Sequence, residues 1–505
     1  MTAITRLFGI AFGLAAFVAC FAHAEMLCDH EAVLDDNGKL QPWTTYDNVL
    51  KGSMAFIQHC PTKTTNLGDD PWYLISSVMN EDGTFRPNQN NQGSNAYWAV
   101  ETVAKYYAYT GDRSSLDCAR MLLDRILKFN TPPDWNWANV PRTQDNSPDG
   151  EYDDPESEPD KMAMVGYAYV RFFRLTGEQK YMEAAVDIAK ALFAHIQPGD
   201  EDNSPLPFRV DLKTGKVVEQ YTANMIAPVL FFDILVDSGL SEYAAPRDAL
   251  WKWILEFPMK NNHWSGYYED VGKHPENYNQ QIPMETARYM LLHPEVAPDY
   301  RTQVPALLTW VRGRFGATKR YGATSVREQD VCFEEMSSHT ARYASVAAMW
   351  FGVTGDAADR EEARAAFALA TYSTFNNASK DGQAINYVGL GYPRPWFSDS
   401  YFDFLAHIID GMSAMPELAP ADADHLLGST GTVKSISYAP GRIEYETFEP
   451  TGNEILRITF TPVKITGGDK PLDASYWQFG EYNGASGVLR IKRDQLTHIA
   501  IEAAK

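Results

Sequence analysis

Adjacent pairs of carboxylates are the residues of this sequence whose type and spacing most readily suggest chemistry. Hydrolysis of a glycosidic bond uses two carboxyls: one is protonated and donates to the leaving oxygen, and the other is ionised and activates water or attacks carbon. Adjacent acids also serve as helix caps, solvated loop charges or calcium ligands, so no pair is decisive alone. The candidate pairs are Asp69-Asp70, Asp153-Asp154, Glu269-Asp270 and Glu334-Glu335.

Glu334 and Glu335 form the pair that we favour as catalytic. They stand just before His339, where an apolar helix is expected to begin, so both should enter the mouth of the fold. Asp153 and Asp154 come second. They lie in the very acidic loop from Asp145 to Asp160, which could instead be a solvated lobe or a weak Ca²⁺ site, although its spacing does not match a calcium-binding loop. We expect no metal ion and no cofactor.

Two further residues are candidates because of their neighbours on expected helices. Glu285 follows Asn279-Gln280-Gln281, whose amides would suit sugar hydroxyls, and its alternative role is that of a buried structural acid. His339 follows Glu335 closely, and its alternative role is that of a core histidine bonded to a backbone carbonyl. Both are carried forward as candidate catalytic residues.

Aromatic side chains are concentrated in the same loops as the acids. The C–H faces of sugars pack on aromatic rings while the hydroxyls bond to nearby polar groups, so the set favours carbohydrate as the substrate. Some of these rings will only anchor loops. The candidate substrate-binding residues are Trp72, Trp135, Trp137, Trp264, Tyr267, Tyr268, Tyr387 and Trp396.

A recurring turn indicates which elements position these residues. Thr110-Gly111-Asp112, Thr176-Gly177-Glu178 and Thr354-Gly355-Asp356 each end an apolar helical run. Glycine ends a helix in the left-handed conformation, and the acidic residue after it begins the next helix. Each motif therefore predicts a tight helical hairpin.

About twelve helices follow from reading outward from these turns. The first helix of each pair is apolar nearly all round and should be buried on both sides, whereas the second is amphipathic. This contrast predicts an inner and an outer ring of helices, which together form an (α/α)6 toroid. The expected helices are 46–59, 95–109, 114–128, 161–175, 179–195, 222–237, 241–257, 281–292, 299–315, 337–353, 359–375 and 399–414.

The connections between hairpins are long, and all should emerge on one rim of the toroid. Long loops in a compact domain are usually functional, so this rim is the expected binding face. We assign 25–415 to the toroid, 416–430 to a linker, and 431–505 to a small β-sandwich or sheet, because alternating β-branched and aromatic residues begin there.

A ring of helical hairpins with glycine turns on one side and long aromatic loops on the other resembles the six-hairpin glycosidase superfamily over about 46–415. The resemblance implies a carbohydrate-active enzyme with its cleft at the N-terminal rim of the inner helices, which here is the long-loop rim. Similar toroids with an added β domain occur in polysaccharide lyases. No family-level catalytic motif identifies individual residues.

Residues 1–24 have the form of a signal peptide ending in Ala22-His23-Ala24, so a secreted or periplasmic protein is expected, with cleavage after Ala24. Lipidation at Cys20 is disfavoured because the usual leucine is missing. Export permits a disulfide, and Cys28 with Cys60 is the expected pair. We expect a monomer that does not span a membrane.

The formal net charge of −22 argues against nucleic acid as a partner and weighs against a polyanionic substrate. The leading hypothesis is therefore a glycoside hydrolase acting on a neutral or mixed glycan. A polysaccharide lyase is the alternative, with a base such as Tyr267 or His339. The uronate carboxylate would then be neutralised by a cation or by amide and basic groups, for which Arg320, Arg327, Arg342 or Arg394 could serve. A non-catalytic glycan-binding protein is the third hypothesis.

Overall fold

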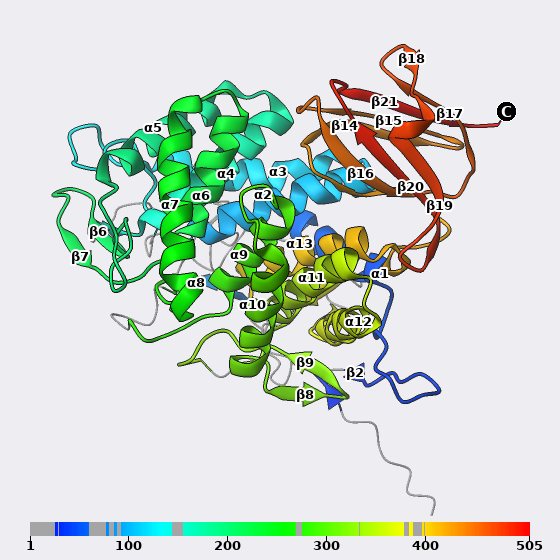
Figure 1. Cartoon of the computed structure of the whole chain (residues 1–505), viewed down its shortest axis with the longest axis horizontal. Coiled ribbons are helices and arrows are strands. Elements are labelled where there is room, and N and C mark those ends of the chain that lie inside the picture. The colour runs from blue at the N-terminus through cyan, green and yellow to red at the C-terminus, as the bar shows by residue number, and fades with distance from the viewer. Residues whose placement is uncertain are drawn as a thin grey trace, which may run out of the picture.

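The chain forms a ring of paired helices with a β module attached to one side (Figure 1). The expected signal peptide, 1–24, lies outside the described residues. This computed structural model describes residues 26–28, 30–59, 77–79, 85–87, 92–143, 155–268, 275–332, 334–377, 383–386, 396–397 and 399–504.

Six inner helices contact one another in turn and close into a ring, in the order α2, α4, α6, α9, α11, α13 and back to α2. Their residues are buried nearly all round because each helix packs on ring neighbours and on an outer helix. The inner helices are α2 (Gln92–Thr110), α4 (Pro159–Thr176), α6 (Ile226–Asp237), α9 (Gln281–Leu292), α11 (Ser337–Thr354) and α13 (Asp399–Ala414).

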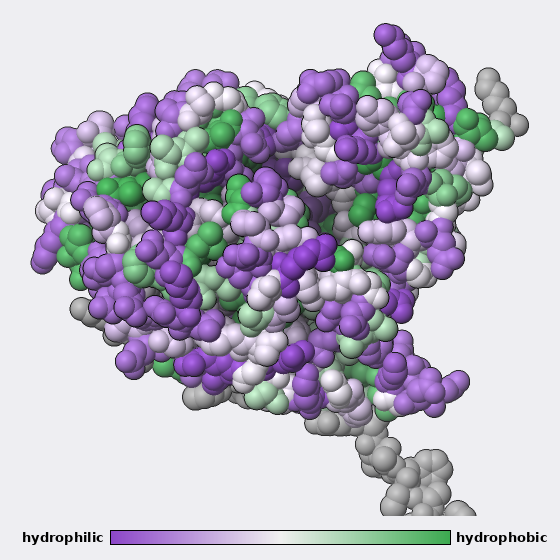
Figure 2. Space-filling model, in the orientation of Figure 1, coloured by the Kyte–Doolittle hydropathy of each residue, from purple (hydrophilic) through white to green (hydrophobic). Residues whose placement is uncertain are grey.

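The outer helices pair with the inner ones, and α1 contacts α13, so the two ends of the toroid together make the sixth hairpin. Hydrophilic residues cover much of the visible face of the ring (Figure 2). The predicted (α/α)6 toroid is confirmed. The outer helices are α1 (Tyr46–His59), α3 (Leu116–Lys128), α5 (Gln179–His195), α7 (Ala244–Glu256), α10 (Tyr300–Arg314) and α12 (Ala357–Thr371).

Glycine makes the hairpin turns as predicted. Gly111, Gly177 and Gly355 have φ of 76°, 78° and 70°, and the N–H of Gly177 donates to the carbonyl of Phe173 at 2.7 Å. Only glycine adopts this left-handed conformation without strain, which is why these positions end helices. Within the described residues, no helix is both long and apolar enough to cross a membrane.

Short antiparallel strands form within the connections between hairpins. The sequence analysis did not predict them. Their hydrophobic runs are too short for a period-2 pattern to stand out. They are β3 (Ser77–Met79), β4 (Phe85–Pro87) and β12 (Trp396–Phe397) in one sheet, β5 (Glu156–Ser157), β6 (Arg209–Asp211) and β7 (Val217–Glu219) in another, and the pairs β8 (Thr318–Arg320) with β9 (Ala323–Ser325), β10 (Thr374–Asn377) with β11 (Gln383–Asn386), and β1 (Met26–Leu27) with β2 (His30–Glu31).

The β module contains two antiparallel sheets, in the orders β13-β16-β20-β19 and β14-β15-β21-β17-β18. Part of the expected linker 416–430 belongs to it, because β13 pairs with β16. The strands are β13 (His425–Ser429), β14 (Val433–Ala439), β15 (Arg442–Thr447), β16 (Gly452–Arg457), β17 (Pro462–Gly467), β18 (Lys470–Pro471), β19 (Trp477–Tyr482), β20 (Ala485–Arg493) and β21 (His498–Ala503).

The β module packs on the C-terminal ends of inner helices. The hydroxyl of Tyr438 donates to the carbonyl of Ala108 near the end of α2, at 2.5 Å. Arg174, near the end of α4, forms a 2.6 Å ion pair with Glu449 of the module. The module therefore lies on the short-turn side of the ring, opposite the N-terminal ends of the inner helices.

Candidate functional site

The N-terminal ends of the inner helices are joined by a chain of polar contacts, which we call the polar belt. Each of its side chains is at most 5% exposed, so electrostatic interactions within it are only weakly screened by water. The polar belt consists of Ser94, Asp160, Lys161, Tyr267, Gln280, Gln281 and His339.

Lys161 lies between two buried carboxyls at the start of α4. Its Nζ is 3.1 Å from Oδ2 of Asp160 and 3.8 Å from Oε2 of Glu158. Burial raises the pKa of Glu158 to about 7 and raises the pKa of Asp160 as well, because one ammonium compensates only part of the cost of two buried charges. Arg209, 3.2 Å from Glu158, also pairs with Glu219. The Glu158–Asp160 pair therefore retains a proton near neutral pH.

Tyr267 connects this carboxyl pair with the neighbouring helices. Its carbonyl accepts from Nζ of Lys161 at 2.5 Å, and the same Nζ lies 3.6 Å from the centroid of its ring. Its hydroxyl shares a 2.6 Å hydrogen bond with Ser94 on α2 and accepts from the amide of Gln281 on α9. The phenol thus ties α2, α4 and α9 together at the mouth of the ring.

His339 is held in one tautomer at the start of α11. Its Nδ1 lies 2.9 Å from Nε2 of Gln280 and 3.0 Å from Nη1 of Arg342. A guanidinium can only donate, so Nδ1 must accept and the ring proton must be on Nε2. That Nε2 faces Oε1 of Glu328 at 3.8 Å. The imidazole therefore presents an N–H toward a carboxylate.

Glu328 is the more exposed partner of this histidine, with 18% of its side chain accessible. Burial alone would raise its pKa, but His339 and hydrogen bonds from Cys332 and Gln329 hold the pKa below its usual value. Helices α4 and α11 stand three places apart in the closed ring of six. Glu328 and Asp160 are therefore associated with opposite inner helices, one kept ionised and the other favouring its protonated form.

Arg342 lies on α11 one turn after His339 and is fully buried. Its guanidinium pairs with Asp403 of α13 and lies 3.4 Å from Glu285 of α9. Burial alone would raise the pKa of Asp403, yet Arg342 and His407, the latter 2.6 Å away, lower it. Because Arg342 is held by these carboxylates, its hydrogen bond to Nδ1 fixes the position of His339.

Several buried polar atoms at this rim have no hydrogen-bond partner among the described residues. They are both amide atoms of Asn95, Oδ1 of Asp160, Oδ1 of Asn224, Oγ of Ser338 and Nε2 of His339. Buried polar groups nearly always have partners, so each exception needs an explanation. Hydroxyls of a bound sugar would supply the missing hydrogen bonds. This rim is the candidate active site.

The sequence-predicted acids occupy different places. Glu335 accepts from Arg320 at 2.8 Å and from Ser325 at 2.7 Å. Burial would raise its pKa, but these bonds and one from Thr318 lower it. Glu334 precedes it without a described contact to the polar belt. Glu285 pairs with Arg288 at 3.2 Å and with Arg342. The structure brings Glu285 and His339 to the belt and directs Glu335 toward β8 and β9.

The predicted aromatic residues also separate into groups. Tyr267 belongs to the polar belt, and the hydroxyl of Tyr268 accepts from Gln280 at 3.5 Å. Trp264 is buried, and its carbonyl accepts from the side-chain amide of Asn279 at 3.0 Å. Trp137 is buried against the ring of His195 at a centroid distance of 3.9 Å, and Arg142 lies 4.8 Å from the ring of Trp135. Outside the described residues or side chains lie Trp72, Tyr387, Trp396, Asp153, Asp154 and Cys60, the last being the expected partner of Cys28.

Sequence reasoning missed Asp160, Lys161 and Glu328. Asp160 was counted as the last member of an acidic loop, although a signal was present: it follows Pro159, a favoured first residue of a helix, and precedes Lys161 in an otherwise apolar run. Glu328 has no comparable signal. Among the described residues, no three His, Cys, Asp or Glu side chains are arranged to hold a metal ion.

Solved structures similar to this chain are sugar-processing enzymes. A cellobiose 2-epimerase from Bacillus thermoamylovorans B4167 matches 72% of this chain and 97% of its own, with a TM-score of 0.54 and 9% identity. A D-mannose isomerase matches 72% and 96%, with a TM-score of 0.52 and 12% identity. A sugar epimerase from a ruminal bacterium matches 70% and 98%, with a TM-score of 0.50 and 11% identity.

These similarities show that the chain has the fold of the six-hairpin glycosidase superfamily, as the sequence resemblance predicted. No protein-family model and no curated protein matches the sequence.

Proposed function

We propose that this protein is a carbohydrate-active enzyme that hydrolyses a glycosidic bond at the polar belt, with Asp160 as general acid and Glu328 as general base. The observation that supports the proposal is a pair of carboxyls, Asp160 on α4 and Glu328 beside the start of α11, whose environments move their pKa values in opposite directions. Carboxyls separated in this way carry the acid and base roles in glycoside hydrolysis.

Asp160 suits the acid role because the carboxyl pair that it forms with Glu158 keeps one proton near neutral pH. Glu158 is engaged by Arg209, whereas Oδ1 of Asp160 has no partner among the described residues. Asp160 is therefore the member that can present the proton to a leaving oxygen. Lys161 would stabilise the carboxylate that remains after proton transfer.

Glu328 suits the base role because it stays ionised and is partly accessible. His339 directs its Nε2–H toward the carboxylate, 3.8 Å away, and so orients Glu328. A water molecule held by Glu328 would attack the anomeric carbon, and the proton of that water would pass to the carboxylate.

The substrate that fits this site is a neutral or mixed glycan. The unpartnered amide and hydroxyl atoms of Asn95, Asn224 and Ser338 suit sugar hydroxyls, and Arg342 is already compensated by Asp403 and Glu285. Acidic residues outnumber basic ones by 66 to 44, which also favours an uncharged substrate.

Digestion of a polysaccharide panel by the purified protein tests the proposal. Appearance of reducing ends without the ultraviolet absorbance of an unsaturated uronate is the expected result. Asp160→Asn and Glu328→Gln should each lower the rate by about 10²–10⁴-fold. Glu335→Gln is the matched comparison: if it abolishes activity while Asp160→Asn does not, the catalytic pair is Glu334-Glu335, as the sequence suggested.

A second candidate is proton transfer at a sugar carbon, as in β-elimination from a uronate or in epimerisation. The fixed tautomer of His339 favours it, because a neutral imidazole N–H can polarise a carbonyl or carboxylate during such a step. Unsaturated products, or solvent deuterium incorporated into an unbroken sugar, would establish this activity in place of hydrolysis. If the protein binds a polysaccharide of the panel but cleaves none of them, glycan binding is the function instead.

A further inference from the structure

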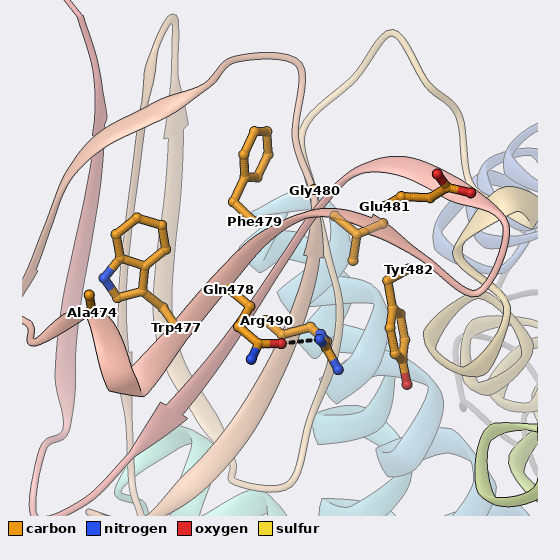
Figure 3. Close-up of a pocket in the computed structure, with 9 residues that line it drawn as sticks. Ala474, Trp477, Gln478, Phe479, Gly480, Glu481, Tyr482 and Arg490 are labelled. Atoms are coloured by element: carbon orange, nitrogen blue, oxygen red, sulfur yellow. Dashed lines mark hydrogen bonds between the residues drawn. The ribbon is translucent and has the colours of Figure 1, made fainter.

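The edge strand β19 of the β module carries an open groove of about 390 Å³, well separated along the chain from the polar belt. That volume is within the range of about 300–1,000 Å³ that ligand pockets occupy. Its lining combines aromatic rings with charged and amide groups (Figure 3): Trp477, Gln478, Phe479, Glu481, Tyr482 and Arg490.

Arg490 organises one side of the groove. Strand pairing places it opposite Gln478, to whose side-chain oxygen it donates, and its guanidinium lies 4.3 Å from the centroid of the Tyr482 ring. Figure 3 shows these three side chains on the same side of the β19–β20 ribbon, with Trp477 on the other side. The aromatic and polar groups are therefore held in place before any ligand arrives.

The two ends of β19 each carry an aromatic ring. Trp477, its first residue, pairs opposite the buried Ile491 and packs against the core, whereas Tyr482, its last residue, projects to the other face beside Arg490. Glu481 and Arg490 carry opposite charges, which leaves the groove without a net charge. An uncharged ligand with an apolar face and hydroxyls matches the lining around Tyr482.

We propose that the β19 groove is a second glycan-binding site, which holds a neutral polysaccharide chain outside the ring. The C–H face of a sugar residue would pack on Tyr482, and its hydroxyls would bond to Gln478 and Arg490 on the same side of the strand. From the proposed function this inference takes only the class of ligand. It does not depend on which reaction occurs in the ring.

Another β-strand is the obvious competing occupant, because an edge strand exposes unpaired backbone groups. The register of β19 shifts between Gly480 and Tyr482, and Gly480 has a φ of 150°, so the row of backbone donors and acceptors is interrupted within the groove. A bulge of this kind blocks regular strand addition. The groove therefore suits a glycan better than a second copy of this chain.

Affinity electrophoresis of the full chain through gels containing glucomannan, galactomannan, xyloglucan or polygalacturonate tests the proposal. All proteins carry Asp160→Asn, so that the polymer in the gel stays intact. The groove variant is Tyr482→Ala with Gln478→Ala. Val463→Ala, at a position 61% exposed on the other sheet of the module, is the matched control. Circular dichroism verifies that each variant is folded.

Retardation by a neutral polysaccharide that falls about tenfold or more in the groove variant, and not in Val463→Ala, is the expected result. Retardation that is unchanged in the groove variant would overturn the proposal, as would its absence in every gel. Self-association in sedimentation that the groove variant abolishes would assign the groove to a second copy instead. Residual cleavage by Asp160→Asn would refute the proposed catalytic role alone, because binding at β19 is measured separately.

Discussion

Nη1 of Arg342 lies 3.0 Å from Nδ1 of His339, and this contact determines which nitrogen of the imidazole carries the proton. The guanidinium is itself held by Asp403 and Glu285 from two other inner helices. The protonation state of a residue at the mouth of the ring is thus set by an ion-pair cluster beneath it. Stability and site geometry depend on the same arginine.

Replacing Arg342 by Ala should therefore be strongly destabilising. The substitution leaves the buried carboxylates of Asp403 and Glu285 without their shared partner, and breaking a buried pair costs about 3–5 kcal/mol. Urea unfolding measures the loss. Lys180→Ala, which breaks a surface pair with Asp124, should cost about 0–1 kcal/mol. Similar losses for the two variants would show that the cluster does not stabilise the ring.

Glu158 makes stability depend on pH in a definite direction. Its pKa is about 7 when folded and near 4.5 when unfolded, so the folded state binds more protons between these values and stability falls as pH rises through that window.

The test is chemical denaturation of the wild type and Glu158→Gln from about pH 4.5 to pH 7.5, the window in which the Glu158 carboxyl titrates. The glutamine variant cannot titrate, so its unfolding free energy should rise relative to that of the wild type as pH increases. A constant difference between the two proteins across the window would mean that Glu158 has an ordinary pKa in the folded protein.

The contact between Arg174 and Glu449 should couple the β module to the ring. Arg174 is almost fully buried and also donates to the carbonyl of Ile234, so Glu449→Ala removes its charged partner while leaving other hydrogen bonds. A loss of about 2 kcal/mol is expected. Calorimetry should show one lowered transition. Two transitions in the wild type would indicate that the module and ring unfold independently.

The sequence predicted the ring well because its signals are local. Glycine turns and the contrast between apolar and amphipathic helices are readable over a few residues, and the bounds of α1, α5, α9 and α13 agree with the predicted ranges. The outer helix α1 pairs with the inner helix α13 because the two ends of the toroid meet when the ring closes. The edge strand β19 was not predicted, because a glycine and a bulge interrupt its alternation.

The candidate site was only partly predictable, because its residues meet through the ring rather than along the chain. His339, Glu285, Tyr267 and Tyr268 were recognised from their neighbours in sequence. Asp160 and Glu328 acquire shifted pKa values only from burial and from contacts that the fold creates, such as Asn224 with Asp160 and His339 with Glu328. Glu335 looked catalytic from its place before a helix, and only the fold reveals its contact with Arg320.

The measurement that tests the central claim most directly is the rate of glycan cleavage by Asp160→Asn, compared with the wild type on the most rapidly digested polysaccharide of the panel. The substitution keeps the size of the side chain and leaves an oxygen that can still accept from Asn224. The fold should therefore persist. A loss of about 10²–10⁴-fold with an unchanged circular dichroism spectrum is predicted. Wild-type rates in the folded variant would contradict the assignment of Asp160 as the acid of this site.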